Sequence, residues 1–372
     1  MFGGETVIRR THPDRILIII MLALTAAGVV MVYSTSFIVA MQRFGDEWFF
    51  VKKHVTFALL GAVLFIISSR VPYHLYRKLT YPILLFAAVL LILVLIPGIG
   101  RQAGGARRWL HLGGLTFQPS EFAKLAVVIF LAYSLEAKKE NIKGFSLGFL
   151  PNIAIPGIII ALIIVEPDFG TAVTLFGLTC MMSFIGGVRV KHLAGLFLAM
   201  LPAFYLIVRN FSYMMDRILV FLDPWKDPEG RGWQTIQSFL AFGSGGVWGV
   251  GLGQSKQKLF YLPEAHTDFI FSIIGEELGL AGIAATIALY LIFLVTGVKI
   301  SSTAKDLFGT YLALGLTFMV TLQALINMAV VLGVLPPKGM PLPFISYGGS
   351  SLVVSMIAVG IILNIYIKGN EA

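Results

Sequence analysis

Apolar runs of about 20 residues recur along almost the whole chain. Each is long enough to cross the hydrocarbon core of a bilayer as a helix. Only 13% of the residues are charged, about half the fraction found in an ordinary soluble domain. The sequence therefore predicts an all-α polytopic membrane protein, built as a single integral membrane domain over residues 1–372.

The apolar runs predict ten membrane-spanning helices, and the even number places both termini on the same side. The longest connection, about 210–267, lies between the seventh and eighth helices. The predicted spans are 16–38, 53–69, 79–97, 119–135, 149–165, 171–187, 192–209, 268–298, 308–334 and 349–367.

The charges predict the orientation of these spans. The terminal and even-numbered connections, from Arg9 and Arg10 to Lys368, carry twice as many Lys and Arg residues as the opposite short connections. Because cytoplasmic loops are enriched in these residues, both termini should be cytoplasmic and the 210–267 connection should face outward. Most of the 19 Asp and Glu residues fall on that outer side. This bias indicates an outward-facing polar cavity.

The basic composition, with a pI of about 9.6, does not indicate nucleic-acid binding, because no soluble basic domain is present. Membrane lipid and phosphate are the expected anionic partners. The chain lacks the P-loop motif, and GVGLGQ at 249–254 lacks the strand and helix that give a glycine fingerprint its meaning. No organic cofactor is expected. The glycine-rich stretch 243–253 either lets backbone approach a ligand or simply forms turns.

Two membrane-proximal segments carry candidate phosphate-binding groups. Arg107 and Arg108 lie in the third outer connection, where an Arg cluster suits bidentate phosphate recognition or interfacial anchoring. Glu121 and Lys124 follow, three residues apart on one helical face. Ionisable groups within a span are costly, so they should pair and by default indicate function.

Further polar residues lie at other outer junctions. Asp168, in EPDFGT (166–171), either caps the helix that follows or contacts a ligand. Arg217 lies in the long outer connection. The last outer loop (333–351) is rich in Pro and Gly and carries Lys338 and Ser346. Such a loop can be re-entrant only if it is buried in protein or lines water.

The stretch YLPEAHTDFIF (261–271) is the strongest candidate for chemistry. It places Glu264, His266, Thr267 and Asp268 directly before an apolar run. A carboxylate at the mouth of a helix is partly desolvated, which raises its pKa towards values useful to a general base. The helix dipole and nearby cations oppose that shift. Alternatively, Asp268 or Thr267 only caps the helix.

Several motifs together resemble the SEDS family (shape, elongation, division and sporulation) of bacterial membrane proteins, and most closely its cell-division branch, with the elongation branch next. They are GARRWLHLGGLTFQPSEFAKL, PDFGTA, RILVFLDPW, YLPEAHTDFIFSIIGEELG and LPPKGMPLPFISYGGSS. The resemblance implies a peptidoglycan glycosyltransferase of the bacterial cytoplasmic membrane that polymerises lipid II at the outer face. It places the catalytic acid at Asp268 and a family Glu–Lys pair at Glu121 and Lys124.

The resemblance also implies a divalent cation, Mg²⁺ or Mn²⁺, without indicating its ligands. The implied partners are a class B penicillin-binding protein, which is a transpeptidase, and other division or elongation proteins. Supporting substrate contacts are expected from Arg107, Arg108, Arg217, Glu264, His266, Thr267, Lys338 and Ser346. Two other functions stay open, a lipid II flippase and a non-catalytic scaffold for the transpeptidase.

Overall fold

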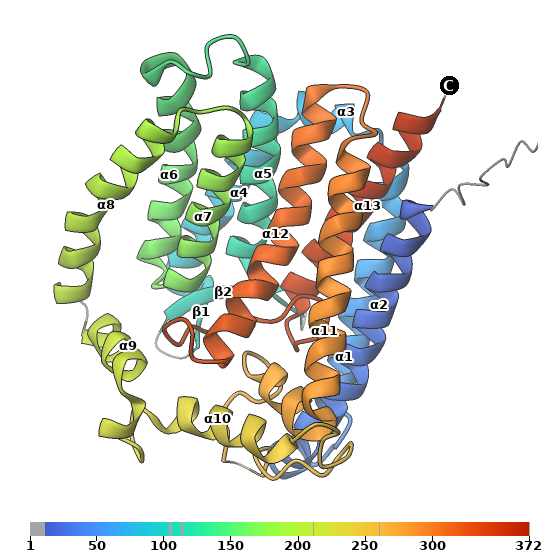
Figure 1. The fold of residues 1–372 in the computed structure, drawn as a ribbon, viewed down its shortest axis with the longest axis vertical. Coiled ribbons are helices and arrows are strands. Elements are labelled where there is room, and N and C mark those ends of the chain that lie inside the picture. Colours follow the sequence, from blue (N-terminus) through green and yellow to red (C-terminus); the bar gives the residue numbers. More distant parts are fainter. Residues whose placement is uncertain (1–11, 104–105, 113–114, 211, 260, 372) are drawn as a thin grey trace, which may run out of the picture.

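The computed structural model describes residues 12–371, except 104–105, 113–114, 211 and 260, so that Arg9 and Arg10 lie outside the described residues. Ten helices coincide with the ten predicted apolar runs, and Figure 1 shows them packed as one bundle. They are α1 (Pro13–Phe44), α2 (Phe49–Arg70), α4 (Thr80–Leu95), α5 (Pro119–Ala137), α6 (Leu150–Val165), α7 (Phe169–Ile185), α8 (Val190–Asn210), α11 (Ile270–Ser301), α12 (Leu307–Val331) and α13 (Gly349–Asn370).

The helices have the length and hydropathy of a polytopic membrane protein. Six described helical segments of at least 18 residues could cross a membrane, and three shorter apolar helices accompany them. The most apolar windows of α12 and α13 are 72% and 78% buried, whereas that of α2 is only 22% buried. Helices α12 and α13 therefore form the interior with α5, and α2 presents much of its apolar surface outward.

The shorter elements gather at the two ends of the bundle (Figure 1). Helices α9 (Ser212–Leu222) and α10 (Trp233–Gly245), with the 3₁₀ turn η2 (Pro224–Lys226), lie at the lower end and make up much of the predicted outer connection. Helix α3 (His74–Lys78) and the π-helical turn η1 (Phe145–Phe149) belong to connections at the other end. Both ends of the described chain also lie in the upper part of the bundle in Figure 1.

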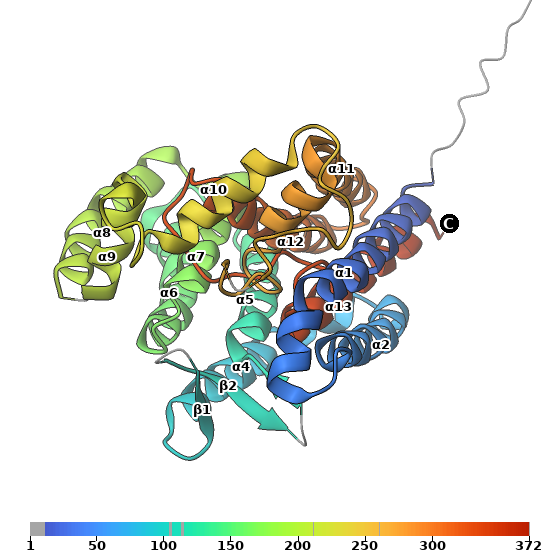
Figure 2. The same cartoon turned by 90° about the horizontal axis from the view of Figure 1, so that it is seen from below.

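The third outer connection departs from the all-α prediction, because it forms a small antiparallel sheet in the order β1-β2-β3. The strands are β1 (Gly100–Ala103), β2 (Ala106–Leu112) and β3 (Leu115–Phe117). Arg101 pairs with Trp109, and Leu110 pairs with Phe117. Figure 2, in which the bundle is seen from below, shows the sheet projecting sideways from the bundle next to α4. Pro119 then begins α5 at a position where its missing N–H costs no hydrogen bond.

Helix α11 is broken at Gly279, whose φ of 66° and ψ of −161° are not helical. The glycine-rich stretch fills the break. The Leu280 N–H donates to the Gly246 carbonyl at 2.9 Å, and the Val250 N–H donates to the Glu276 carbonyl at 3.0 Å. Gly249 has a φ of +80°, a conformation that side chains rarely adopt. The stretch therefore approaches the protein's own helix, where it satisfies backbone groups that the break would expose.

Candidate functional site

A polar cavity of about 240 Å³ opens among α5, α7, β2 and the loops that precede α11 and α13. It brings together residues that lie up to 294 positions apart in the sequence, from Phe57 to Ser351. The predicted site residues that line it are Arg108, Glu121, Glu264, Thr267 and Asp268. Other lining residues are Trp109, Gln118, Asp168, Thr171, Gly339, Met340, Pro341 and Tyr347.

Asp268 is half-buried at the wall of this cavity. Burial, reinforced by Glu264 and opposed by the positive charge of Arg217, raises the pKa of its carboxyl to about 7. Helix α11 begins after Phe269 with no side-chain cap, so the alternative that Asp268 or Thr267 caps the helix is wrong. The Thr267 hydroxyl instead donates to the Glu264 carboxylate at 3.0 Å. The Asp268 carboxylate therefore does not cap the helix, and the residue lines the cavity.

Three cations act on the region around Asp268. Burial and the charge of Arg108 lower the pKa of Arg217 to about 10, so its guanidinium stays charged at neutral pH. Burial and the charge of Arg217 lower the pKa of Lys338 to about 8. Arg108 donates from Nε to the Glu166 carbonyl at 3.3 Å and from Nη2 to the Pro167 carbonyl. Of the three, only Arg108 lines the cavity. Arg217 and Lys338 add positive charge close to it, so that the three side chains form a cationic group suited to a polyanionic ligand.

Arg107 and Arg108 are separated by the strand on which they lie. Successive residues of a strand point to opposite faces, and Arg108 lines the cavity whereas Arg107 does not. Arg107 pairs through its backbone with Gln102 in β1. The sheet therefore places one of the two arginines at the cavity, a choice that their adjacent positions in the sequence left open.

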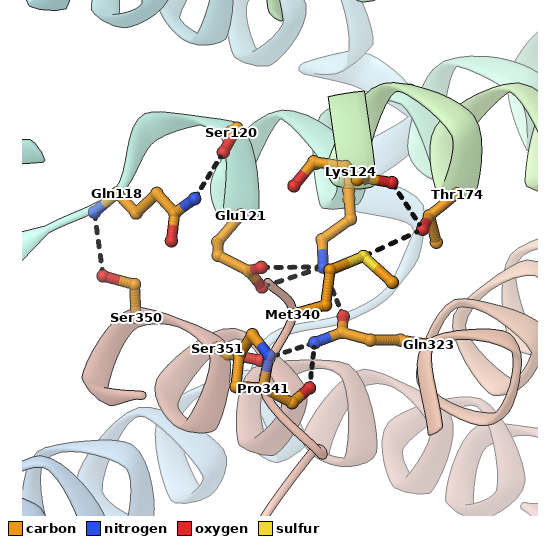
Figure 3. A network of polar contacts seen from close by, with 12 residues as sticks. Gln118, Ser120, Glu121, Lys124, Thr174, Gln323, Met340, Pro341, Ser350 and Ser351 are labelled. Carbon is orange, nitrogen blue, oxygen red and sulfur yellow. Dashed lines mark hydrogen bonds and ion pairs between the residues drawn. The ribbon is translucent and has the colours of Figure 1, made fainter. Parts of the chain in front are cut away.

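Glu121 and Lys124 form a buried ion pair beneath the cavity (Figure 3), as predicted for charges within a span. Lys124 Nζ lies 2.9 Å from the Glu121 carboxylate, and both side chains are less than 5% exposed. Lys124 also donates to the side-chain carbonyl of Gln323, whose amide donates to the Pro341 carbonyl at 2.9 Å. The pair thus connects α5 to α12 and to the last outer loop. Glu121 lines the cavity, and Lys124 lies behind it.

Asp168 has both of the roles considered from the sequence. It caps α7 by accepting from the Thr171 backbone N–H at 3.2 Å, and it lines the cavity, where Gln118 donates to it at 3.1 Å. The neighbouring Glu166 is fully buried, and its carboxyl has no hydrogen-bond partner among the described residues. Burial and the charge of Asp168 raise the pKa of the Glu166 carboxyl to about 9. Glu166 is therefore neutral at pH 7.

Ser346 and His266 are two further predicted contact residues that do not line this cavity. Ser346 is buried, and its hydroxyl accepts from the Leu342 N–H at 2.8 Å, so it shapes the last outer loop. His266 packs against Phe50 and Tyr347 and lines a separate cavity of about 200 Å³ with Arg43. Burial lowers the pKa of its imidazole. Both residues shape the walls of the site.

A second buried ion pair anchors the outer connection. Lys258 Nζ lies 3.0 Å from Glu277, and both side chains are 3% exposed or less. The Ser34 hydroxyl of α1 donates to the same carboxylate at 2.7 Å. Glu276 accepts from the Ser255 hydroxyl and from the Lys256 N–H. Both glutamates therefore have partners inside the bundle.

Two residues at the site were not singled out from the sequence. An added Cβ at Gly339 would lie 2.7 Å from Oδ2 of Asp268, so the loop backbone packs directly on the carboxylate. Asn327 donates to the Asp268 carbonyl at 2.8 Å. Contacts between segments distant in sequence leave no local signal, so neither role could be found from spacing.

The side chains at the cavity could hold a divalent cation only if a bound substrate supplied further oxygen ligands. Among the residues that the structure describes, no group of three or more His, Cys, Asp or Glu side chains could hold a metal ion. Asp168 and Asp268 are two carboxylates that line the same cavity. Mg²⁺ commonly binds through one or two carboxylates together with substrate phosphates. The residues present fit that arrangement.

The bundle and its cavity define a polytopic helical membrane protein with an acid and a cationic group at one end. The FtsW/RodA/SpoVE family of cell cycle proteins matches residues 14–371, and the chain belongs to this family. The SEDS resemblance inferred from the motifs is thereby confirmed.

Similar proteins are known in several bacteria. The chain is 47% identical over 352 residues to the "Probable peptidoglycan glycosyltransferase FtsW" of Geobacter metallireducens, covering 95% of this chain and 94% of that protein. It is 42% identical to "Stage V sporulation protein E" of Bacillus subtilis, with 96% and 98% covered.

Two solved structures share the fold. One, described as "Structural coordination of polymerization and crosslinking by a peptidoglycan synthase complex", has a TM-score of 0.79 at 29% identity, with 96% of this chain and 98% of that chain covered. The other is the rod shape determining protein RodA of Thermus thermophilus, with a TM-score of 0.68 at 25% identity and 96% and 97% covered.

Proposed function

We propose that this protein is a peptidoglycan glycosyltransferase that polymerises lipid II into glycan strands at the outer face of the cytoplasmic membrane, in septal wall synthesis. The relatives named as FtsW support both the activity and the division role. The observation that carries the mechanism is Asp268, a carboxylate with a pKa of about 7 in a cavity that Arg108 also lines.

The proposed reaction forms a bond between the 4-hydroxyl oxygen of the acceptor sugar and the anomeric carbon of the donor. Asp268 accepts the hydroxyl proton, and the polyprenyl diphosphate leaves with the electron pair of the broken bond. A base is most effective when its pKa lies near the working pH, which fits Asp268. Glu264 and Thr267 line the cavity beside Asp268.

The cationic group stabilises the departing diphosphate in this proposal. Arg108, Arg217 and Lys338 place positive charge where negative charge develops. A bound Mg²⁺ or Mn²⁺ would be held by Asp168, which leaves the Asp268 carboxylate free to act as the base, and would supply further charge neutralisation. Glu121 continues the polar wall, while Lys124 keeps its carboxylate in place.

An apolar cavity beside the polar one provides a place for the polyprenyl chain. Its volume is about 340 Å³, and its lining residues are Ile164, Phe169, Ala172, Val173, Phe176, Phe197, Met200, Leu201 and Met214. The two cavities share the first turns of α7, since Asp168 and Thr171 line the polar one. One molecule with a charged head and a hydrocarbon tail can therefore reach both.

The orientation and the partner belong to the same proposal. The chain crosses the membrane ten times with both termini cytoplasmic, so that the polar cavity faces outward. A class B penicillin-binding protein is the proposed partner, since the structural neighbour is described as a complex that coordinates polymerisation with crosslinking.

The experiment that tests the function is polymerisation by the purified protein in detergent, with and without the transpeptidase and a chelator. Detergent leaves no bilayer across which to flip lipid II, so glycan strands formed there identify an enzyme. A protein that forms none under any of these conditions would support the flippase or the scaffold. The chelator arm tests the divalent cation.

The pH dependence of polymerisation should be bell-shaped. The rate is expected to rise through about pH 7, as Asp268 loses its proton, and to fall above about pH 8, as Lys338 loses its charge. Lys338→Arg keeps the charge to higher pH and should move only the alkaline limb upward. The exposed Lys226→Arg is the matched control. An alkaline limb unaffected by Lys338→Arg would remove Lys338 from the diphosphate site.

Gly339→Ala should slow polymerisation about 100-fold, because misplacement of a reacting group by about 1 Å can cost that much. The new Cβ would lie 2.7 Å from Asp268 Oδ2, so the carboxylate or the loop must move. Gly243→Ala adds the same methyl in α10, where nothing lies within 4 Å. Initial rates of the two variants make the comparison, and equal rates would contradict the prediction.

A further inference from the structure

Three segments that are distant in sequence meet around Asp268. The loop before α13 joins the stretch before α11 through the Tyr347 N–H, which donates to the His266 carbonyl at 3.0 Å. The same loop places Gly339 directly against the Asp268 carboxylate. Helix α12 supplies the third segment.

Asn327 of α12 joins the other two segments with a single side chain. Its amide nitrogen donates to the Asp268 carbonyl at 2.8 Å and to the Met340 carbonyl at 2.6 Å. The residue is 2% exposed, and its own Oδ1 has no hydrogen-bond partner among the described residues. Both amide hydrogens therefore serve the junction between the acid and the loop.

We propose that Asn327 is a positioning residue, which holds Asp268 and the last outer loop in register for the glycosyl transfer; this rests on the function proposed above. A primary amide provides the two neutral donors that two adjacent carbonyls need. An aspartate there would provide none when ionised, and a lysine would bring a buried charge. An apolar residue would leave two carbonyls without these donors, which is costly in a buried site.

The proposal separates Asn327 from the neighbouring Gln323. Gln323 accepts from Lys124 and donates to Pro341 and Ser351, so it belongs to the ion-pair network of Figure 3. Asn327 instead contacts the residue that acts as the base, through its backbone. Its loss should therefore displace the carboxylate without removing any group that touches the substrate.

The test compares Asn327→Leu with Asn364→Leu, each of which replaces a buried amide by an apolar side chain of similar size. Asn364 is also 2% exposed and makes two hydrogen bonds, to the Ser69 carbonyl at 2.8 Å and from the Tyr73 N–H at 2.9 Å. It lies near the other end of the bundle, so it reports the general cost of losing such a side chain.

Asn327→Leu should lower kcat for polymerisation about 10- to 100-fold, change KM for lipid II by less than about threefold and leave the acidic limb of the pH profile in place. Asn364→Leu should leave kcat within about threefold. A threefold change in kcat or KM corresponds to about 0.7 kcal/mol. Equal kcat values for the two variants would overturn the proposal.

Hydrogen exchange measures the same junction without relying on activity. In Asn327→Leu, backbone amides of 264–269 and 338–347 should exchange at least about tenfold faster than in the wild type, and in Asn364→Leu they should not. Unchanged exchange in Asn327→Leu would overturn the positioning role even in a protein that makes no glycan. Absence of glycan from the wild type would instead count against the proposed function.

Discussion

Asp268→Asn should reduce glycan polymerisation by about 10²- to 10⁴-fold, the range that general-base catalysis contributes. Asparagine has nearly the same shape but cannot accept the proton of the acceptor hydroxyl. The measurement is the rate of glycan formation by the purified variant in detergent. Glu229→Gln is the control, because Glu229 is an exposed carboxylate of the same outer connection. Near-normal synthesis by Asp268→Asn would eliminate Asp268 as the base.

The loss of activity should not come from loss of the fold. The pKa of Asp268 is raised in the folded state to about 7, so folding favours the protonated form. Its stabilising contribution is complete below the ordinary carboxyl pKa and is lost as the pH rises through about 7. A neutral asparagine avoids that loss. At pH 8, Asp268→Asn should therefore unfold at the same temperature as the wild type or at a higher one.

Lys124→Met should have the largest effect on stability, about 3–5 kcal/mol. The substitution leaves the Glu121 carboxylate, which is 3% exposed, without its ion-pair partner inside the bundle. It also leaves the side-chain carbonyl of Gln323 without the donor that the ammonium supplies. The midpoint of thermal or denaturant unfolding in a fixed detergent measures the loss.

The double variant Glu121→Leu with Lys124→Met isolates the cause. Replacing both members of a buried pair by apolar groups is often neutral or stabilising, so the double variant should recover most of the stability lost by Lys124→Met. The exposed pair of Lys368 with Glu371 provides the other control, and Lys368→Met should change the unfolding midpoint little. A double variant as unstable as Lys124→Met would show that packing, and not charge, is responsible.

Most of the bundle follows from the spacing of apolar residues. A run of about 20 such residues forms a helix because its backbone must satisfy its own hydrogen bonds within lipid. The local pattern predicts α5 and its ion pair equally well, since Glu121 and Lys124 lie three apart on one face. The break at Gly279 was missed, because the apolar run continues through it and the hydrogen bonds that fill it come from residues 246 and 247.

The candidate site was predicted only as a set of polar segments. Asp268 and the cations could be named from the sequence, because charged residues beside an apolar run are costly and few. Their pKa values could not be predicted from the sequence, because the desolvation and the neighbouring charges come from segments that meet only in the folded protein. The same reason explains why Arg108 and not Arg107 lines the cavity, and why Gly339 lies on the carboxylate.

The pattern of apolar and charged residues is enough to predict a helical membrane protein and a polar candidate site that includes Asp268, because the hydrophobic effect and the cost of buried charge act on local composition. Which groups meet at that site depends on the fold. Asn327, Gly339 and Asp268 are far apart in the chain, and only the packing of α12 and the last outer loop against the start of α11 brings their atoms within contact distance.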